Sequence, residues 1–300
     1  MTVANRLYRG DADRLLIHDL LRQANGPEPA PTICYLGDFE WWQVNDDNPD
    51  ALRSVRLWFV GDRLAAFGWP SGNSLDVVAH PEHRDLEMAI VDDWIAGQAD
   101  RSAALSVNAL ESDTSRIAIL EGRGFVSTGR HHNVWSKPLN EAQPDLPPAD
   151  GYTVRSFAGE QEIESRVAAH RSAFHPSRMT VEKHRRAMAS PIYHQDLDLV
   201  AVAPDGQIAS YALIWFDEVN RKGLFEPVGT HADHRRRGLS RCVIQEGLRR
   251  LHGLGAKLAY VNSNADDIAS NALYAACGFE IIDGEARWER PGEPATTPRA

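Results

Sequence analysis

The sequence predicts an α/β protein with a mixed sheet, built as two tandem domains of the same layout. Its 300 residues exceed the usual size of a single domain. His80-Pro-Glu-His-Arg84 lies 151 residues before His231-Ala-Asp-His-Arg235, and Gly124-Phe125 lies 154 residues before Gly278-Phe279. Two landmarks in the same order and at nearly the same offset indicate an internal duplication.

Each half carries two β-rich runs before the first landmark. A short turn joins the runs, at Gly61-Asp62 in the first half and at Pro204-Asp205-Gly206 in the second. Gly and Asp between apolar runs are typical of a β-hairpin. The four runs are Val55–Val60, Arg63–Trp69, Leu197–Val202 and Gln207–Trp215. We therefore expect an antiparallel hairpin in each half.

The second half continues with a helix, because Ile244, Leu248 and Leu251 recur at helical spacing with polar residues between them. Each half then ends in a strand-like segment. Residues 140–150 contain three prolines and no periodic apolar pattern, which is typical of a linker. We expect a first domain over residues 1–139, a linker over 140–150, a second domain over 151–290 and a disordered tail over 291–300.

The composition argues against several classes of protein. A content of 43% hydrophobic and 25% charged residues is that of an ordinary globular protein. The formal net charge of -10 argues against a nucleic-acid-binding protein and suits a cationic small substrate. Three widely spaced cysteines and the lack of a long apolar run favour a reducing compartment and no membrane span. We expect a cytoplasmic protein, a monomer or a homodimer, that binds neither nucleic acid nor membranes.

Two motifs, Thr230–Ser240 and Leu273–Phe279, indicate the chemistry. The first follows an apolar strand, passes through an Arg/Gly-rich loop and opens the amphipathic helix. Backbone N–H groups at such a helix start attract a pyrophosphate, and Gly238 lets a phosphate approach the backbone closely. The second motif places Tyr274 on a short helix before a Gly-Phe turn. Together they suggest a coenzyme A site with an acid beside its sulfur.

On these residues each half resembles the GNAT superfamily of acetyl-CoA-dependent N-acetyltransferases. The second half matches the family's pyrophosphate-loop pattern as Arg235-x-x-Gly238-x-Ser240, and its Leu-Tyr-x-x-x-Gly-Phe pattern at residues 273–279. Ser240 departs from the usual final Gly or Ala of the loop. Asp267 stands where the family often has Asn.

The resemblance covers residues 151–290 well and residues 1–139 weakly. It implies two tandem GNAT-like domains, the N-terminal one degenerate, as in mycothiol synthase-like proteins. It also implies acetyl-CoA (coenzyme A) as the cosubstrate. The twelve histidines show no metal-ligand spacing, so we expect no metal. Ten residues fall on the cofactor-binding positions of the family: Val228, Thr230, Arg235, Arg236, Arg237, Gly238, Leu239, Ser240, Asp267 and Ser270.

Acetyl transfer to an amine needs a base and an acid. An alkyl amine starts protonated, so a base must remove a proton, and the leaving thiolate needs a proton. Tyr274 is the expected acid. Glu226, flanked by apolar residues, is the expected base, although many family members have the base two residues earlier, where this chain has Leu224. The alternatives are a Glu226 that fixes a neighbouring strand and a Tyr274 that packs against the sheet.

Pro227 removes one ladder donor beside this glutamate and favours separation of neighbouring strands. The family uses such a separation to admit the pantetheine arm of coenzyme A.

The first half lacks these groups. Glu87, Leu75 and Leu120 occupy the positions of the loop glycine, the base and the acid. A carboxylate in the loop would oppose pyrophosphate binding. We expect this half to form a wall of the substrate cleft, with Gly37–Trp42, read as a strand, presenting Trp and carboxylate side chains there. His131-His132 is expected on a strand edge.

The expected function is that of an acetyl-CoA-dependent N-acetyltransferase. It would transfer an acetyl group to a primary amine of a small molecule by direct attack in a ternary complex. One alternative is a non-catalytic acyl-CoA-binding or regulatory protein, which Leu224 in place of an acid supports. The other is a transferase that acts on a protein N-terminus or lysine, which an open acidic groove would favour.

Overall fold

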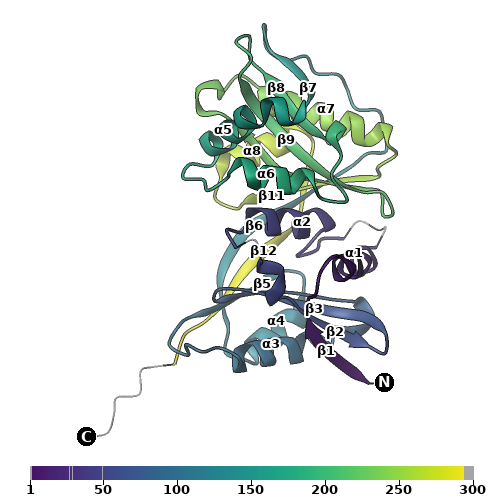
Figure 1. Cartoon of the computed structure of the whole chain (residues 1–300), viewed down its shortest axis with the longest axis vertical. Helices are drawn as coiled ribbons and strands as arrows, with labels where there is room; N and C mark the ends of the chain where they lie inside the picture. The colour runs from purple at the N-terminus through teal and green to yellow at the C-terminus, as the bar shows by residue number, and fades with distance from the viewer. Residues whose placement is uncertain (1, 27, 29, 49, 294–300) are drawn as a thin grey trace, which may run out of the picture.

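Twelve strands form one continuous mixed sheet that runs along the molecule (Figure 1). The computed structural model describes residues 2–26, 28, 30–48 and 50–293. Within them the strands follow the order β1-β2-β3-β4-β5-β12-β6-β11-β10-β9-β8-β7. Residues 294–300 of the tail predicted to be disordered lie outside the described residues.

The two halves contain the same elements in the same order. The first half consists of β1 (Val3–Leu7), α1 (Asp11–Asn25), α2 (Leu36–Asn45), β2 (Arg56–Val60), β3 (Arg63–Ser71), β4 (Ser74–Ala79), α3 (Leu86–Ala96), β5 (Leu105–Leu110), α4 (Thr114–Glu121) and β6 (Val126–Pro138). The second consists of β7 (Thr153–Ser156), α5 (Ile163–Ala173), α6 (Val181–Met188), β8 (Asp198–Val202), β9 (Ile208–Asp217), β10 (Lys222–Thr230), α7 (Leu239–Gly253), β11 (Leu258–Asn264), α8 (Ile268–Ala276) and β12 (Glu280–Arg290). The mixed α/β class and the repeated layout are confirmed.

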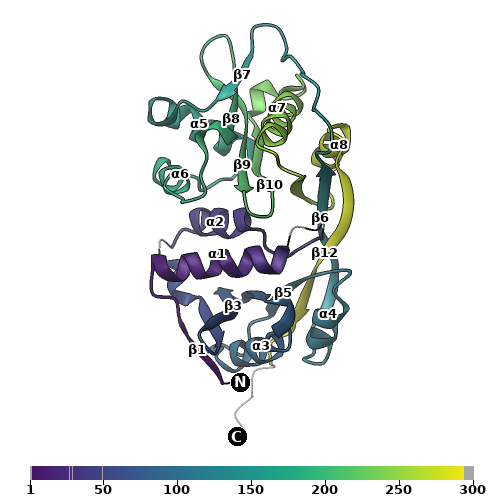
Figure 2. The same ribbon diagram turned by 90° about the vertical axis from the view of Figure 1, so that its right-hand side faces the viewer.

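Both predicted hairpins are present. Strands β2 and β3 pair antiparallel, as do β8 and β9. Each half also contains one parallel pair, β4 with β5 and β10 with β11. The described helices lie on both faces of the sheet, with α5 and α6 opposite α7 and α8 in the second half (Figure 2). None of them is long and apolar enough to cross a membrane.

The final strands of the two halves are exchanged. Strand β6 of the first half lies between β12 and β11, with Pro138 opposite Leu258 and His132 opposite Asn264. Strand β12 of the second half pairs in turn with β5 of the first half, over residues 285–290. Both strands pass from one half to the other in Figure 2. The sheet therefore crosses the predicted domain boundary at residue 139.

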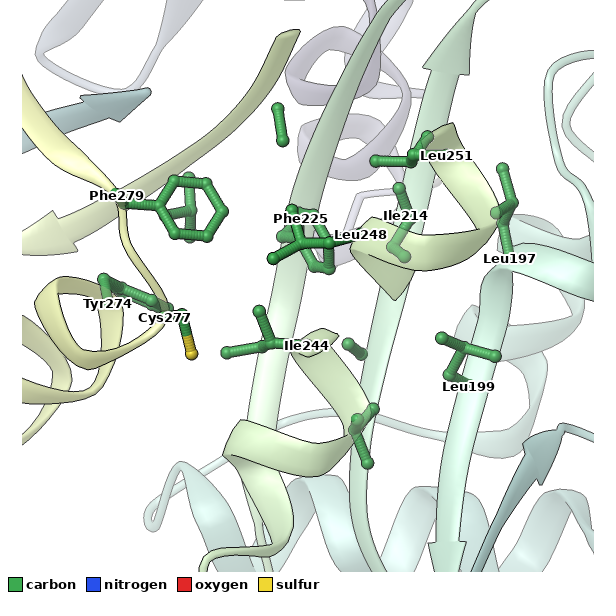
Figure 3. Packing of buried hydrophobic residues seen from close by; sticks show 14 of the residues in the cluster. Leu197, Leu199, Ile214, Phe225, Ile244, Leu248, Leu251, Tyr274, Cys277 and Phe279 are labelled. Carbon is green, nitrogen blue, oxygen red and sulfur yellow. The ribbon is translucent and has the colours of Figure 1, made fainter. Parts of the chain in front are cut away.

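The core of the second half is organised by α7. Ile244, Leu248 and Leu251 are buried and point toward β9 and β10, as their spacing predicted (Figure 3). Ile214 and Phe225 meet them from these two strands (Figure 3). This packing holds the start of α7 against the end of β10, which is where the first motif lies.

The prediction of a strand over Gly37–Trp42 is wrong. This segment belongs to helix α2, which lies between the two halves (Figure 2). Its glycine is needed for packing, because a Cβ atom on Gly37 would lie 2.5 Å from Cβ of Trp215 in β9. Trp41 is buried against α5 and α6 of the second half. The tryptophans thus serve a helix interface between the halves, which bulky aromatic residues also suit.

Candidate active site

Strands β10 and β11 separate in the middle of β10. They pair only over Lys222–Leu224 and Leu258–Tyr260. Beyond that point β10 stays with β9, but its register shifts between Phe225 and Val228, around Pro227. Because proline has no N–H group to donate to a ladder, the change in pairing occurs where the sequence predicted it.

A cavity of about 570 Å³ lies at this separation. Residues of both halves line it: Ile33, Asp38, Trp42, Asp76, Asn108, His132, Phe174, Glu226, Pro227, Val228, Asn262, Ser263, Asn264, Asp267, Ser270, Tyr274 and Glu285. The structure thus brings together five of the predicted site residues, Glu226, Val228, Asp267, Ser270 and Tyr274. The predicted acid and base face the same space.

Glu226 lies in an apolar section of β10. Burial raises the pKa of its carboxyl to about 7, although the nearby His132 acts in the opposite direction. The indole Nε1 of Trp215 donates a hydrogen bond of 2.7 Å to the backbone carbonyl of Glu226 and fixes the strand there. Among the described residues the carboxylate has no hydrogen bond or ion pair, so the structure gives no support to a strand-fixing role for the side chain.

Tyr274 is 6% exposed and lies on α8. Its ring contacts Trp135 and Phe279, with centroids 6.2 Å away in each case. Burial raises the pKa of its hydroxyl above the ordinary value, and the charge of Glu226 adds to this effect. The ring therefore packs against the sheet while the residue lines the cavity, and the phenol remains protonated at neutral pH.

The predicted pyrophosphate loop lies between β10 and α7. Gly238 immediately precedes α7 with φ of 74°, and Arg236 has φ of 61°. Left-handed residues in such a loop turn backbone N–H groups toward one side, as an anion-binding loop requires. A Cβ atom on Gly238 would meet nothing within 4 Å, so here glycine is favoured by the backbone angle rather than by packing.

The loop side chains differ in what they offer a ligand. Arg235, Arg236 and Arg237 are exposed, and Arg235 donates a hydrogen bond of 3.1 Å to the carbonyl of Ala173. Leu239 is 1% exposed and belongs to the core, so only its backbone could contact a cofactor.

The remaining predicted cofactor residues are engaged with one another. The hydroxyl of Thr230 hydrogen-bonds to Ser240 and, at 2.9 Å, to Ser210. Asp267 caps α8, accepting from the N–H groups of Ala269 and Ser270 and, at 2.5 Å, from the Ser270 hydroxyl. None of the residues Thr230–Ser240 lines the cavity, so the loop lies beyond its edge.

The equivalent region of the first half is filled by its own charges. Glu87 is 2% exposed and pairs with Arg84 at 2.7 Å and with Arg116 at 3.0 Å. Arg84 also pairs with Asp113 at 2.6 Å. The carboxylate that replaces the loop glycine therefore forms ion pairs with the guanidinium groups that an anionic ligand would need. Leu75 and Leu120, in place of base and acid, are both buried.

Sequence reasoning missed several cavity residues. The expectation of a strand edge for His132 is wrong, since β6 lies between two strands and His132 pairs with Glu285 of β12 at 3.2 Å. Asp38 faces the cavity as expected, but Glu40 is fully buried and bound to Arg14 and His18. Asp76 and Asn108 had no recognisable local signal.

Comparison with known proteins decides the family. Residues 163–279 match the model of the acetyltransferase (GNAT) family. These residues form a GNAT acetyltransferase domain. The match spans the separated strands, the loop of Gly238 and the helix of Tyr274, and it supports an N-acetyltransferase activity of the GNAT type.

Similar proteins extend over both halves. A mycothiol acetyltransferase of Nocardiopsis dassonvillei is 23% identical and is aligned over 97% of this chain and 98% of its own length. A GCN5-related N-acetyltransferase from Sphaerobacter thermophilus has the same fold, with a TM-score of 0.64, 21% identity and 98% of each chain covered. A tandem GNAT protein from the clavulanic acid biosynthesis pathway also reaches 0.64, with 16% identity, over 98% of this chain and 99% of its own. The tandem GNAT fold is confirmed.

Proposed function

We propose that this enzyme transfers the acetyl group of acetyl-CoA to a primary amine of a small molecule, by direct attack in a ternary complex. The observation that supports this most is the cavity at the separation of β10 and β11, where Glu226 and Tyr274 face the same space. Acetyl-CoA would supply the thioester that the amine attacks.

Glu226 is the base in this proposal. A carboxyl with a pKa of about 7 is half ionised at neutral pH, so it is basic enough to take a proton from an ammonium group, directly or through a water molecule. Tyr274 is the acid, because its protonated hydroxyl lines the same cavity and can donate a proton to the departing sulfur.

The chain has a suitable place for the cofactor's pyrophosphate. The start of α7 presents backbone N–H groups after two left-handed residues, and exposed arginines of the loop lie beside them. Gly238, Leu239 and Ser240 would bind through their backbone, and Arg235–Arg237 through their charge. The pantetheine arm would then lie between β10 and β11, next to Val228.

A small acceptor fits the site better than a protein substrate. The cavity is bounded by α2, β4 and β5 of the first half as well as by the second half, so an acceptor would lie between the two. A protein N-terminus or lysine would require a groove open along its length. The presence of both acid and base also favours an enzyme over a binding protein.

Calorimetric titration of acetyl-CoA tests the cofactor site. We expect one site per chain in the wild type and at least about 100-fold weaker binding in Gly238→Glu, because a carboxylate would lie beside the pyrophosphate. Gly238→Ala is the matched control, since it strains the backbone equally but adds no charge. Two sites per chain would show that the first half binds the cofactor too, and an unchanged affinity of Gly238→Glu would contradict the proposed loop.

A further inference from the structure

The cavity is strongly acidic. Five of its lining residues are carboxylic acids, Asp38, Asp76, Glu226, Asp267 and Glu285, and no lysine or arginine is among the described residues that line it. Two of these acids already have partners, since Asp267 caps α8 and Glu285 pairs with His132. Glu226 is the proposed base. Asp38 and Asp76 therefore remain without a role in the acetyl transfer.

Asp38 is buried with one oxygen unused. It is 3% exposed, and its Oδ2 atom accepts a hydrogen bond of 2.8 Å from the backbone N–H of Tyr35. Within the described part of the chain, Oδ1 has no hydrogen-bond partner. Burial raises the pKa of this carboxyl well above its usual range, and the charges of Glu226 and Glu285 raise it further. A cation in the cavity would offset the unfavourable free energy of ionising this buried carboxyl.

Asp76, on β4, also has an unused carboxylate. Its carboxylate has no hydrogen bond or ion pair with any other described residue. The guanidinium group of Arg116, whose charge acts on Asp76, is already bound to Glu87 and to the carbonyl of Val77. Burial raises the pKa of the Asp76 carboxyl to about 6. The charge of Glu285 adds to this rise, and the charge of Arg116 opposes it.

A third unpartnered group, in the second half, also lines the cavity. The Oδ1 atom of Asn262 in β11 is buried and has no hydrogen-bond partner among the described residues. It can accept a bond from an N–H or O–H donor of a ligand. A metal ion does not explain these groups, since no three His, Cys, Asp or Glu side chains in the described ranges are placed to hold one. The unused acceptors are instead spread over a cavity large enough for an organic molecule.

We propose that the acceptor carries a second cationic group besides the amine that is acetylated, and that Asp38 and Asp76 of the first half bind it. This inference rests on the proposed function, because it assigns the reacting amine to the end of the cavity with Glu226 and Tyr274. The acceptor class is thus a diamine, or a larger polar molecule with two amino groups. The first half, which has lost the acid, the base and the loop glycine, then serves to select the substrate.

The test compares diamines with amino alcohols of the same chain length, in which a neutral hydroxyl replaces the second ammonium. Both series are titrated into the protein saturated with coenzyme A, and both are assayed for release of coenzyme A from acetyl-CoA. We expect the best diamine to bind at least about tenfold more tightly than its amino alcohol, since charge-assisted hydrogen bonds are worth about that much. In turnover the difference should appear in KM rather than in kcat.

The variant Asp76→Asn should lower the ratio of diamine to amino alcohol kcat/KM by about tenfold. Asp38→Asn should act in the same direction and serves if the first variant does not fold, because asparagine keeps an oxygen for the N–H of Tyr35. Asp62→Asn is the matched control, since Asp62 is exposed in the turn between β2 and β3. It should leave the ratio unchanged.

Equal binding and equal turnover of diamine and amino alcohol by the wild type would overturn the inference and leave the proposed function intact. Failure of every amine to release coenzyme A would count against the proposed function. The titrations would still decide whether a second cation is recognised.

Discussion

Glu226 owes its chemistry to its place just past the last residue of β10 that pairs with β11. Leu224 still pairs with β11 and is buried in the core, whereas Glu226, two residues later, faces the cavity. The period of two along a strand gives both the same face, but only the second position lies beyond the pairing with β11. A base shifted by two residues thus reaches the site because the strands have already separated.

The pH dependence of catalysis should report this residue. Glu226 accepts a proton only when it is ionised, so kcat should rise with pH through about 7 and level off above it. Glu226→Gln should lower kcat by about 10²- to 10⁴-fold and abolish this limb. The measurement is a pH–rate profile with saturating acetyl-CoA and amine. A wild-type profile that is flat around pH 7, or a limb that survives in the glutamine variant, would show that another group is the base.

At the scale of elements, helices α1 and α2 are joined by a buried ionic cluster. Glu40 of α2 is fully buried and accepts hydrogen bonds from Arg14 at 2.8 Å and from His18 at 2.7 Å, both on α1. Burial alone would raise the pKa of Glu40, but these two bonds outweigh it and lower the pKa to about 2. Because α2 also presents Asp38 and Trp42 to the cavity, the cluster fixes one wall of the site.

Removing this charge should destabilise the fold. Glu40→Gln leaves the Arg14 guanidinium without a counter-charge and removes the carboxylate that His18 contacts, so we expect a loss of about 3 kcal/mol at pH 7, measured by urea unfolding. The pKa of Glu40 is lower in the folded than in the unfolded state, so its stabilisation is present above pH 4.5 and is lost as the pH falls toward 2. The difference in unfolding free energy between wild type and variant should therefore become smaller below pH 4.5. If this difference stays constant with pH, the lost stability comes from altered packing and not from the charge of Glu40.

At the scale of the whole molecule, the exchanged strands make the two halves one structure. Strand β6 completes the sheet next to β11, and β12 completes it next to β5. Between β6 and β7 the chain passes from one half to the other through residues 140–150, most of which are exposed. The pairing of strands, rather than the linker, should hold the halves together.

Cleavage of the linker tests this. A protease site inserted after Gln143 should be cut in the folded protein, and the two fragments should remain together in size-exclusion chromatography. Acetyl transfer by the cut protein should stay within about twofold of the uncut protein, since no described cavity residue lies in the linker. An intact chain with the same insertion is the control. Separation of the fragments without denaturant would contradict a shared sheet.

Local patterns were sufficient to predict the second half. Helix α7 has a regular apolar spacing, and the bulge at Pro227 and the left-handed Gly238 follow from properties of single residues. The placement of Glu226 and Tyr274 in one cavity followed from the same motifs. Binding of the cofactor by the loop residues stays a prediction.

The contribution of the first half could not be predicted in the same way. Asp38, Asp76 and His132 reach the cavity from α2, β4 and β6, and only the pairing of distant strands places these elements side by side. Strand exchange has no local signal, because β6 offers the same alternation of side chains whichever neighbour it pairs with. The helix at Gly37–Trp42 was missed because adjacent tryptophans favour a strand by propensity, whereas contacts with both halves decide the outcome.

The exchanged strands also set the order in which the molecule can be completed during synthesis. The sheet of the first half ends at β5 until β12 arrives, and β12 is formed by residues 280–290 of a 300-residue chain. A ribosome must therefore translate the segment 280–290 before the first half can close. Until then β5 and β6 expose unpaired backbone edges, which is the condition under which nascent chains bind chaperones or aggregate. Slow folding is the expected consequence of these long-range strand pairings.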